Sequence, residues 1–367
     1  MFRKIRARHP DFFLLGLIFI LTVFGLVILA SASSDLGKIK WNDSYYYLKH
    51  QISFGLLFGL LGFLVAYFIP YQKFKRVALV LLILNLAVVA LVFTPLGVSA
   101  GGASRWIKFG SFTFQPAELL KISFVIYLAS WLADLKSRRS KDFKRSFLPF
   151  LVVSTVVAGL LIFQPATSMV AILLAAAGIM YVLSGVEWKY IFSILSLGAV
   201  GLLLLIFFTP YRLERITSFF NKGSDSLGSN YHLNQALIAI GSGQLTGTGF
   251  GKSTAKTTYL PAVIDDSIFA VMAQELGFLG AASLVILFLL LTLRLFWLAV
   301  KTRDQFGKLI LVGFAVIIAV QSLVNMGSIS GILPLTGVPL PFISYGGTAL
   351  AVFLTMSGVA LNISKNS

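Results

Sequence analysis

Charged residues are scarce in the apolar stretches of this chain, so the few that occur there are the first candidates for chemistry. The 367 residues include only 13 aspartates and glutamates. Glu118, Asp266 and Glu275 lie inside or at the edge of long apolar runs, and the cation Lys121 accompanies the first of them. Because ionisable groups are costly in such surroundings, each is a candidate functional residue.

Glu118 and Lys121 are three residues apart in a stretch that begins with Pro116. Proline is favoured in the first turn of a helix, and a spacing of three places two side chains on the same helix face. The spacing therefore predicts an ion pair within an apolar helix. Two interpretations stay open: the pair fixes helix packing, or it lines a cavity that binds substrate.

Asp265 and Asp266 immediately precede the apolar run 267–300. Aspartate is a preferred N-cap and its charge suits a helix N-terminus, so capping is one interpretation. The other is that one aspartate caps the helix while the second faces a cavity as a general base. Glu275 follows Asp266 by nine residues, which is the opposite side of a regular helix. The two carboxylates therefore cannot form a paired acid–base site, and we expect Glu275 to have a partner on another helix.

Cations gather in two connecting segments. Arg105 stands beside Trp106, and a long segment rich in Gly, Ser and Thr carries Arg212, Arg215, Lys222, Lys252 and Lys256. A cation cluster over a membrane cavity would suit an anionic substrate such as a diphosphate. A solvated loop surface is the alternative for any one of these residues.

The sequence gives little support to metal or nucleotide chemistry by the protein alone. His9, His50 and His232 are scattered, cysteine is absent, and no residues stand at metal-ligand spacing. The glycine-rich stretch 241–251 does not follow a strand in a βαβ unit, so it is a weak nucleotide fingerprint.

The elements that must position these residues are transmembrane helices. Hydrophobic residues make up 57% of the chain and charged residues only 12%, about half the share in soluble domains. We expect an all-α polytopic membrane protein, a single domain over residues 1–367, with about ten spans. The runs are 12–32, 51–69, 77–95, 116–134, 148–164, 166–186, 190–209, 267–300, 308–328 and 343–363. The eighth run is too long for one simple span and is expected to tilt or extend beyond the hydrocarbon.

Basic residues mark alternate connections and so set the orientation. They lie in the N-terminal stretch and in the 70–76, 135–147 and 301–307 loops, which fall on one side if every span is real. The positive-inside rule makes that side, and both termini, cytoplasmic. The formal charge of +17 is therefore an orientation signal, and nucleic-acid binding is not expected.

The opposite, outer side carries the segments with candidate site residues. They are 33–50, 96–115, the large extracytoplasmic loop 210–266 between spans 7 and 8, and 329–342. The last is uncharged, apolar and broken by three prolines, so it is expected to re-enter the protein. Gly55, Gly59 and Gly62 predict a close helix contact in the second span.

Several long motifs, in order along the whole chain, resemble the shape, elongation, division and sporulation proteins, the FtsW/RodA family of bacterial cell-wall polymerases. The motifs are Arg105-Trp106, Phe114-Gln115-Pro116-Ala117-Glu118-Leu119-Leu120-Lys121, Tyr211-Arg212-Leu213-Glu214-Arg215, Gln235 to Gly243, Tyr259-Leu260-Pro261, Asp266-Ser267-Ile268-Phe269-Ala270, Glu275 to Gly280, and Leu340 to Gly347. The 334–341 segment looks more like the division and sporulation branch.

The resemblance implies an enzyme of the bacterial cytoplasmic membrane that polymerises lipid II, an undecaprenyl-diphosphate-linked disaccharide-peptide, at the outer face. It implies Asp266 as the general base of an inverting transfer, with undecaprenyl diphosphate leaving. It also implies a class B penicillin-binding protein as partner, membrane lipids around the spans and room for a divalent cation, Mg or Mn. Its substrate-binding positions are Arg105, Trp106, Glu118, Lys121, Arg212, Arg215, Gln235, Ser253, Lys256 and Ser344.

Some positions depart from the family pattern. Ala166 stands where Asp is usual, Gln274 replaces the first of two glutamates, and Ala262 and Ile264 stand where Glu and His are common. These departures put roles at those auxiliary positions in doubt. A flippase or other transporter of lipid-linked precursors is the alternative function, and a non-catalytic scaffold is a third. Transporters often show two matching halves, and the sequence shows none.

Overall fold

The computed structural model describes residues 9–100, 103–110, 112–135, 142–209, 213, 215, 217, 219–220, 231–254, 256 and 260–366. Its α-helices are α1 (Phe12–Trp41), α2 (Tyr46–His50), α3 (Leu57–Phe68), α4 (Tyr71–Ala90), α5 (Pro116–Ala133), α6 (Leu148–Phe163), α7 (Thr167–Leu183), α8 (Trp188–Phe207), α10 (Tyr231–Ser242), α12 (Ile268–Lys301), α13 (Gln305–Ile329) and α14 (Gly347–Asn366). Single turns of other helix types, η1 (Gln51–Leu56), η2 (Leu91–Phe93) and η3 (Phe143–Phe147), adjoin α3, α4 and α6.

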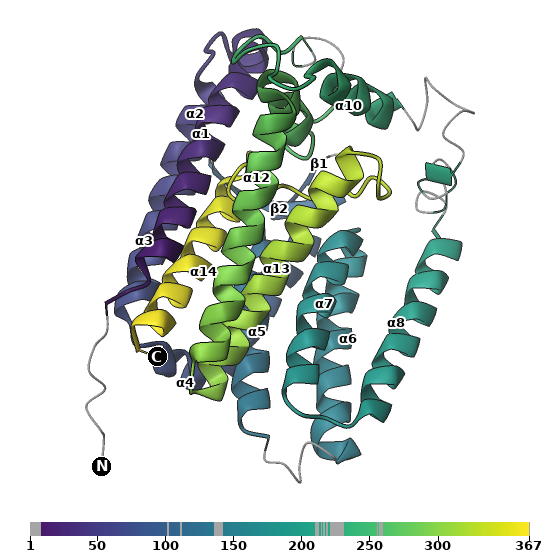
Figure 1. Ribbon diagram of the computed structural model, residues 1–367. Helices are drawn as coiled ribbons and strands as arrows, with labels where there is room; N and C mark the ends of the chain where they lie inside the picture. Colours follow the sequence, from purple (N-terminus) through teal and green to yellow (C-terminus); the bar gives the residue numbers. More distant parts are fainter. Residues whose placement is uncertain are drawn as a thin grey trace.

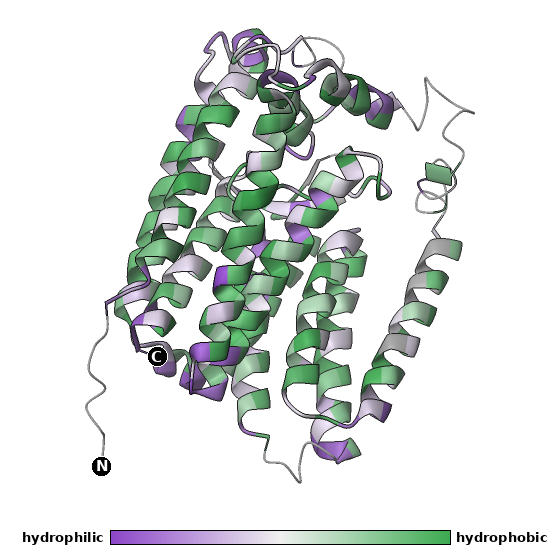
Figure 2. Cartoon of the chain, in the orientation of Figure 1, coloured by the Kyte–Doolittle hydropathy of each residue, from purple (hydrophilic) through white to green (hydrophobic). Residues whose placement is uncertain are grey.

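The long helices form one bundle with two polar ends. Figure 1 shows the start of α1 and the end of α14 at the same end, and α10 at the other. Hydrophobic residues cover the length of the bundle, and hydrophilic residues gather at the two ends (Figure 2). That banding is the pattern of a protein that crosses a bilayer.

Three helices form the core of the bundle. The apolar windows of α13, α14 and α5 are 78%, 72% and 67% buried, whereas that of α2–α3 is only 22% buried. The outer helices pack around these three: α3 against α14, α12 and α7 against α13, and α4 against α5. Many apolar side chains of the outer helices are therefore exposed on the surface of the bundle, where they would contact lipid.

The expectation of about ten spans is confirmed approximately. Among the described residues, eight helices are long and apolar enough to cross a membrane, and shorter apolar helices occur at Thr167–Leu183 and Trp188–Gly201. The first helix is longer than the expected run 12–32. It continues to Trp41, because polar Ser31, Ser34 and Asp35 find hydrogen-bonding or ionic partners. It ends in a Schellman turn with Asn42 in the left-handed region at φ 52°.

The glycines of the second span make the predicted close contact, and their partner is α14. A Cβ added at Gly59 would lie 2.5 Å from Leu354 Cδ1, and one at Gly62 would lie 2.1 Å from Thr355 Oγ1. Gly55 approaches the backbone of Gly347 in the same way. Small residues thus let the two helices approach without a gap.

The outer segment 96–115 is not a simple loop. It forms a three-stranded antiparallel sheet of β1 (Gly97–Ala100), β2 (Ala103–Phe109) and β3 (Phe112–Phe114), in the order β1-β2-β3. Gly97 pairs with Ile107, and Ile107 pairs with Phe114. The sequence prediction contained no strand, because three short strands give little periodic signal beside long apolar runs.

The overlong eighth run is explained by a break. Gly277 interrupts α12 with φ 65° and ψ −166°. At this break Phe278 N donates to Gln244 O at 2.8 Å, and Gly249 N donates to Glu275 O at 3.1 Å. The segment 268–276 is therefore tied to the outer loop, and the longer part after Gly277 is left to cross the membrane.

Gly277→Ala should destabilise the protein by about 3 kcal/mol. The new Cβ would lie 2.3 Å from Gly247 N, on a backbone in the left-handed region. Thermal unfolding in detergent measures the loss. Gly178→Ala is the control, because its Cβ meets nothing within 4 Å and alanine favours a helix. Equal midpoints for the two variants would contradict the packing described at the break.

Candidate active site

Asp266 lies in a tight turn that leads into α12. Asp265 N and Ser267 N both donate to Ala262 O, at 3.1 and 3.2 Å, and Ala262 has φ 48°. Ser267 occupies the N-cap of α12. The capping interpretation of the two aspartates is therefore wrong, because the turn places a serine at the position they were expected to hold.

The carboxylate of Asp266 is largely surrounded by protein, but one of its oxygens lacks a hydrogen bond among the described residues. Its Oδ1 is buried and has no hydrogen-bond partner among the described residues. Its Oδ2 lies 3.6 Å from the position that a Cβ of Gly337 would take, so the group faces the 334–339 segment. A buried carboxylate oxygen without a donor has a lone pair free to accept a proton.

Two basic side chains act on this carboxylate. Arg215 donates from Nη1 to Leu335 O at 2.7 Å, on the segment that Asp266 faces. His232 of α10 lies 2.6 Å from Ser267 Oγ through Nε2, and Ser267 Oγ donates to Pro261 O at 2.9 Å. Since the serine proton is used for Pro261, Nε2 is the donor to Ser267. The histidine is thus fixed beside the aspartate.

The electrostatics of the turn favour protonated carboxyls. Burial raises the pKa of Asp266, and the charges of His232 and Arg215 oppose that rise. Asp265 is exposed at the molecular surface, and partial desolvation by the surrounding protein, followed by the charge of Asp266, raises the pKa of its carboxyl to about 7. Burial lowers the pKa of His232, with Asp266 opposing and Arg215 reinforcing the change. Asp266 is therefore a stronger base than an exposed aspartate.

The segment before α14 re-enters the protein, as predicted. Val338, Leu340 and Phe342 are buried. Asn325 Nδ2 of α13 donates to Val338 O at 2.7 Å and to Asp266 O at 2.9 Å. One amide thus holds the re-entrant segment and the backbone of the candidate base together.

Ser344 belongs to the same framework. Its hydroxyl donates to Asp265 O and accepts from Leu340 N at 2.8 Å. The next residue, Tyr345, donates from its main-chain N to Ile264 O at 2.9 Å. Ser344 is therefore joined to the turn that carries Asp266.

Glu118 and Lys121 form the predicted ion pair, with Nζ 2.7 Å from Oε2 and the side chains 2% and 0% exposed. The ammonium also lies 4.6 Å from the centre of the Phe353 ring on α14. The pair therefore joins α5 to α14 in the core of the bundle.

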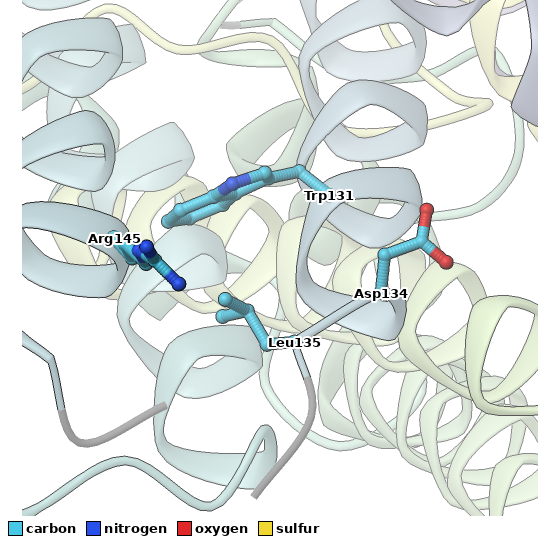
Figure 3. Close-up of a pocket in the computed structure, with 4 residues that line it drawn as sticks. All are labelled: Trp131, Asp134, Leu135 and Arg145. Atoms are coloured by element: carbon cyan, nitrogen blue, oxygen red, sulfur yellow. The ribbon is translucent and has the colours of Figure 1, made fainter. Parts of the chain in front are cut away.

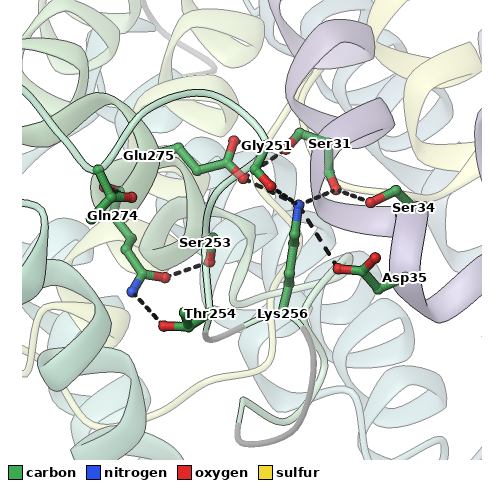
Figure 4. Close-up of polar contacts among 10 residues, drawn as sticks. Ser31, Ser34, Asp35, Gly251, Ser253, Thr254, Lys256, Gln274 and Glu275 are labelled. Atoms are coloured by element: carbon green, nitrogen blue, oxygen red, sulfur yellow. Dashed lines mark hydrogen bonds and ion pairs between the residues drawn. The ribbon is translucent and has the colours of Figure 1, made fainter.

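Ser253, Lys256 and Glu275 form a separate polar cluster at the break in α12 (Figure 4). Ser253 Oγ donates to Gln274 Oε1, and Lys256 Nζ lies 3.6 Å from Glu275 Oε1. Ser31 Oγ of α1 contacts both oxygens of Glu275, at 2.6 and 2.7 Å. The expectation that Glu275 has its partner on another helix is confirmed.

The other predicted site residues lie apart from these clusters or outside the described residues. Arg105 donates from β2 to Gln164 O at 3.0 Å and to Pro165 O, and Trp106 pairs with Val98 in the sheet. Gln235 lies one turn after His232 on α10. Arg212 and Lys222 lie outside the described residues.

A cavity of about 390 Å³ lies at the other end of the bundle, where α5 ends (Figure 3). Trp131, Asp134, Leu135 and Arg145 line it. Asp134 also pairs with Lys75 at 2.6 Å. This cavity is remote from the turn that carries Asp266, so it contributes nothing to the candidate site.

The whole chain matches a known family. The family model of the FtsW/RodA/SpoVE cell cycle proteins matches residues 12–367. The chain belongs to this family. A probable peptidoglycan glycosyltransferase FtsW of Geobacter sp. (strain M18) is 34% identical over 360 residues, covering 98% of both chains. Stage V sporulation protein E of Bacillus subtilis (strain 168) is 33% identical over 366 residues, covering 99% of both.

Solved structures share the fold. The rod shape determining protein RodA of Thermus thermophilus matches with a TM-score of 0.70 and 27% identity, covering 97% of this chain and 96% of that one. A chain from a structure described as a peptidoglycan synthase complex that coordinates polymerization and crosslinking matches with a TM-score of 0.77 and 27% identity, covering 97% of each. The membrane architecture is therefore that of the FtsW/RodA family.

Two residues at the site were missed by sequence reasoning. His232 was one of three scattered histidines, and Asn325 is a neutral amide in an apolar run. Gln321, Asn325 and Ser328 recur at spacings of four and three on α13, which is a helical face. Polar residues at that spacing in a span were the signal that could have found Asn325.

The contribution of Asp265 to the free energy of unfolding should fall as pH rises from about 4 to about 7. The folded state holds a proton on Asp265 up to a pKa of about 7, whereas the unfolded chain releases it near 3.8, so proton binding favours the fold between those values. Asp265→Asn should flatten this slope in thermal unfolding. Asp43→Asn should leave it intact, because Lys49 and the Tyr45 amide lower the pKa of that exposed carboxyl. An unchanged slope in Asp265→Asn would contradict the raised pKa.

Proposed function

We propose that this protein is a peptidoglycan glycosyltransferase that polymerises lipid II at the outer face of the bacterial cytoplasmic membrane. The observation that carries the proposal is Asp266, a largely buried carboxylate in a chain that matches the FtsW/RodA family over residues 12–367. One of its oxygens has no hydrogen-bond partner among the described residues, and the charge of Arg215 acts on it. Relatives named as probable peptidoglycan glycosyltransferases support the reaction class.

In the proposed reaction a sugar 4-hydroxyl of one lipid-linked chain attacks the anomeric carbon of another, with inversion. The new C–O bond forms as the bond to the diphosphate breaks, and that electron pair leaves with undecaprenyl diphosphate. Asp266 accepts the hydroxyl proton in the transition state. A retaining glycosidase needs two carboxylates placed across one bond, whereas the proposed reaction uses the single carboxylate of Asp266.

Cations neutralise charge on the departing diphosphate. Arg215 is the best placed, because it acts on Asp266 directly and contacts the segment that Asp266 faces. Arg105 is a further candidate, whereas Lys121 and Lys256 are enclosed by contacts within the protein. Among the described residues no group of three carboxylate or imidazole side chains could hold a metal. A divalent cation such as Mg²⁺ or Mn²⁺ would add to the neutralisation of charge on the diphosphate.

The proposed setting follows from charge and architecture. The basic loops and both termini face the cytoplasm, and the turn with Asp266 lies towards the outer side. A class B penicillin-binding protein is the proposed partner, supported by the similar chain from a peptidoglycan synthase complex. The apolar faces between helices would hold the lipid tails of both substrates.

Asp266→Asn should lower the rate of glycan polymerisation at least about 100-fold, because the base is lost. Lipid II binding and partner binding should be unchanged. The test uses purified protein with lipid II and its partner, with gel analysis of the glycan chains. Asp43→Asn on the same side is the control and should be fully active. Normal chains from Asp266→Asn would overturn the base, and lipid II movement across liposomes without polymer would favour a flippase.

The acid limb of the polymerisation rate should move to higher pH in Arg215→Met. Arg215 lowers the pKa of Asp266, so its loss raises the pH at which the base becomes deprotonated. The rate above the limb should also fall by about tenfold, because a cation near the diphosphate is gone. Lys252→Met, in the same outer loop, is the control. A profile shifted equally by both changes, or by neither, would contradict the role of Arg215.

A further inference from the structure

The ammonium of Lys256 is enclosed by the protein's own acceptors. The side chain is 5% exposed, and Nζ lies 2.7 Å from Gly251 O and 3.4 Å from Ser31 O. Glu275 Oε1 is 3.6 Å away and Asp35 Oδ2 is 3.9 Å away. The positive charge is thus already matched by two carboxylates and two carbonyls (Figure 4). A cation that binds an incoming diphosphate needs donors aimed at open space, and this one has its donors turned inward.

Glu275 completes the cluster from the opposite side. Its carboxylate is 0% exposed and accepts from the Ser31 hydroxyl through both oxygens. The hydroxyl donor and the neighbouring ammonium offset part of the cost of burying this carboxylate. The pair therefore fastens the outer part of α1 to the break in α12.

The two charged residues flank Asp266 almost symmetrically in the sequence. Lys256 precedes it by ten residues and Glu275 follows it by nine. Their contact brings together the two ends of the segment between Lys256 and Glu275. Asp266, the candidate general base, lies near the middle of this segment. Gln274 makes a second connection next to the Lys256–Glu275 contact, donating to Ser242 Oγ at 2.9 Å and to Thr254 Oγ1 at 3.3 Å while accepting from Ser253.

We propose that Lys256 and Glu275 are a positioning pair, and that Lys256 does not touch substrate. The pair joins the two ends of the segment that carries Asp266 and connects them to α1. The inference rests on the proposed function, for which Asp266 is the base. The ammonium of Lys256 balances the charge of Glu275. The segment joined by this pair holds Asp266 against the re-entrant segment. The pair acts on turnover through the placement of Asp266, and lipid II affinity does not depend on it.

The test compares Lys256→Met, Glu275→Gln and the double variant. Each single change leaves one charge buried without its partner, whereas the double change leaves none and keeps an amide for Ser31 to contact. Each single variant should lose at least about tenfold in kcat with KM for lipid II nearly unchanged. The double variant should recover to within about threefold of the wild-type rate.

The control removes an exposed ion pair on the same side. Lys49→Met breaks the contact of Lys49 with Asp43, in which the side chains are 68% and 35% exposed. It should leave kcat and KM unchanged, because an exposed pair contributes little. This comparison separates loss of a buried charge balance from loss of any lysine on the outer side.

Lipid II affinity, measured separately by titration with a fluorescent lipid II, decides between positioning and substrate contact. Unchanged affinity in all three variants supports the positioning pair. Weakened binding in both Lys256→Met and the double variant would overturn it and make Lys256 a diphosphate ligand. A double variant as inactive as the singles would overturn it as well.

Thermal unfolding keeps the inference separate from the proposed function. If wild type makes no polymer with its partner, the proposed function fails, yet the pair is still tested. The singles should then unfold at lower temperature than wild type and the double variant near wild type. A double variant that unfolds as early as the singles would overturn the pairing whatever the activity.

Discussion

Irregular polypeptide inside an apolar bundle must have its main-chain polar groups satisfied by the protein, and this requirement governs the outer half of the molecule. The re-entrant segment 332–346 and the turn 261–267 both lack regular hydrogen bonding. Asn325 and Gln321 supply donors from the central helix α13, to Asp266, Val338 and Pro339 carbonyls. Ser344 and Gln51 add further links at the start of α14. The turn that carries Asp266 and the re-entrant segment are thus hydrogen-bonded by amides and hydroxyls that carry no charge.

The same requirement explains how three carboxylates in apolar surroundings differ. Glu118 is paired with Lys121 in the core, and Glu275 is bonded by Ser31 and faces Lys256. Both have their charge matched by contacts within the protein. Asp266 instead keeps an oxygen without a donor among the described residues, with Arg215 and His232 near but not bonded to that oxygen. The candidate reactive carboxylate therefore differs from the other two by having a buried oxygen without a hydrogen-bond donor among the described residues.

Much of this arrangement could be predicted from the sequence, and the limits have physical causes. Apolar runs predicted the membrane-spanning helices, because bilayer thickness acts on each segment separately. The Glu118–Lys121 pair, the glycine face of α3 and the re-entry of 329–342 were predicted for the same local reason. The role of Asn325, the partners of Glu275 and the proximity of His232 depend on contacts between distant segments. No local pattern could provide these.

The predictions that failed also share a cause. Capping by Asp265 or Asp266 follows from local preference, but the turn at Ala262 places Ser267 at the helix start. The first helix extends beyond its apolar stretch because its polar residues contact α12 and the outer loop. In both cases tertiary contacts outweighed a correct local tendency.

The length of α1 has a consequence for the energetics of the proposed lipid substrate. Ser31 lies nineteen residues after Phe12, where the helix begins, which is about 29 Å of helix and close to the thickness of the hydrocarbon layer. The polar cluster around Ser31 therefore lies about one hydrocarbon thickness along α1 from the start of the helix. Moving an isoprenoid tail from the hydrocarbon layer into water costs about 0.8 kcal/mol per methylene. A site far above the hydrocarbon layer would have to pull the tail out against that cost. In the proposed reaction, a site at this distance along α1 would let the polymer grow away from the membrane while the lipid tails stay in the hydrocarbon layer.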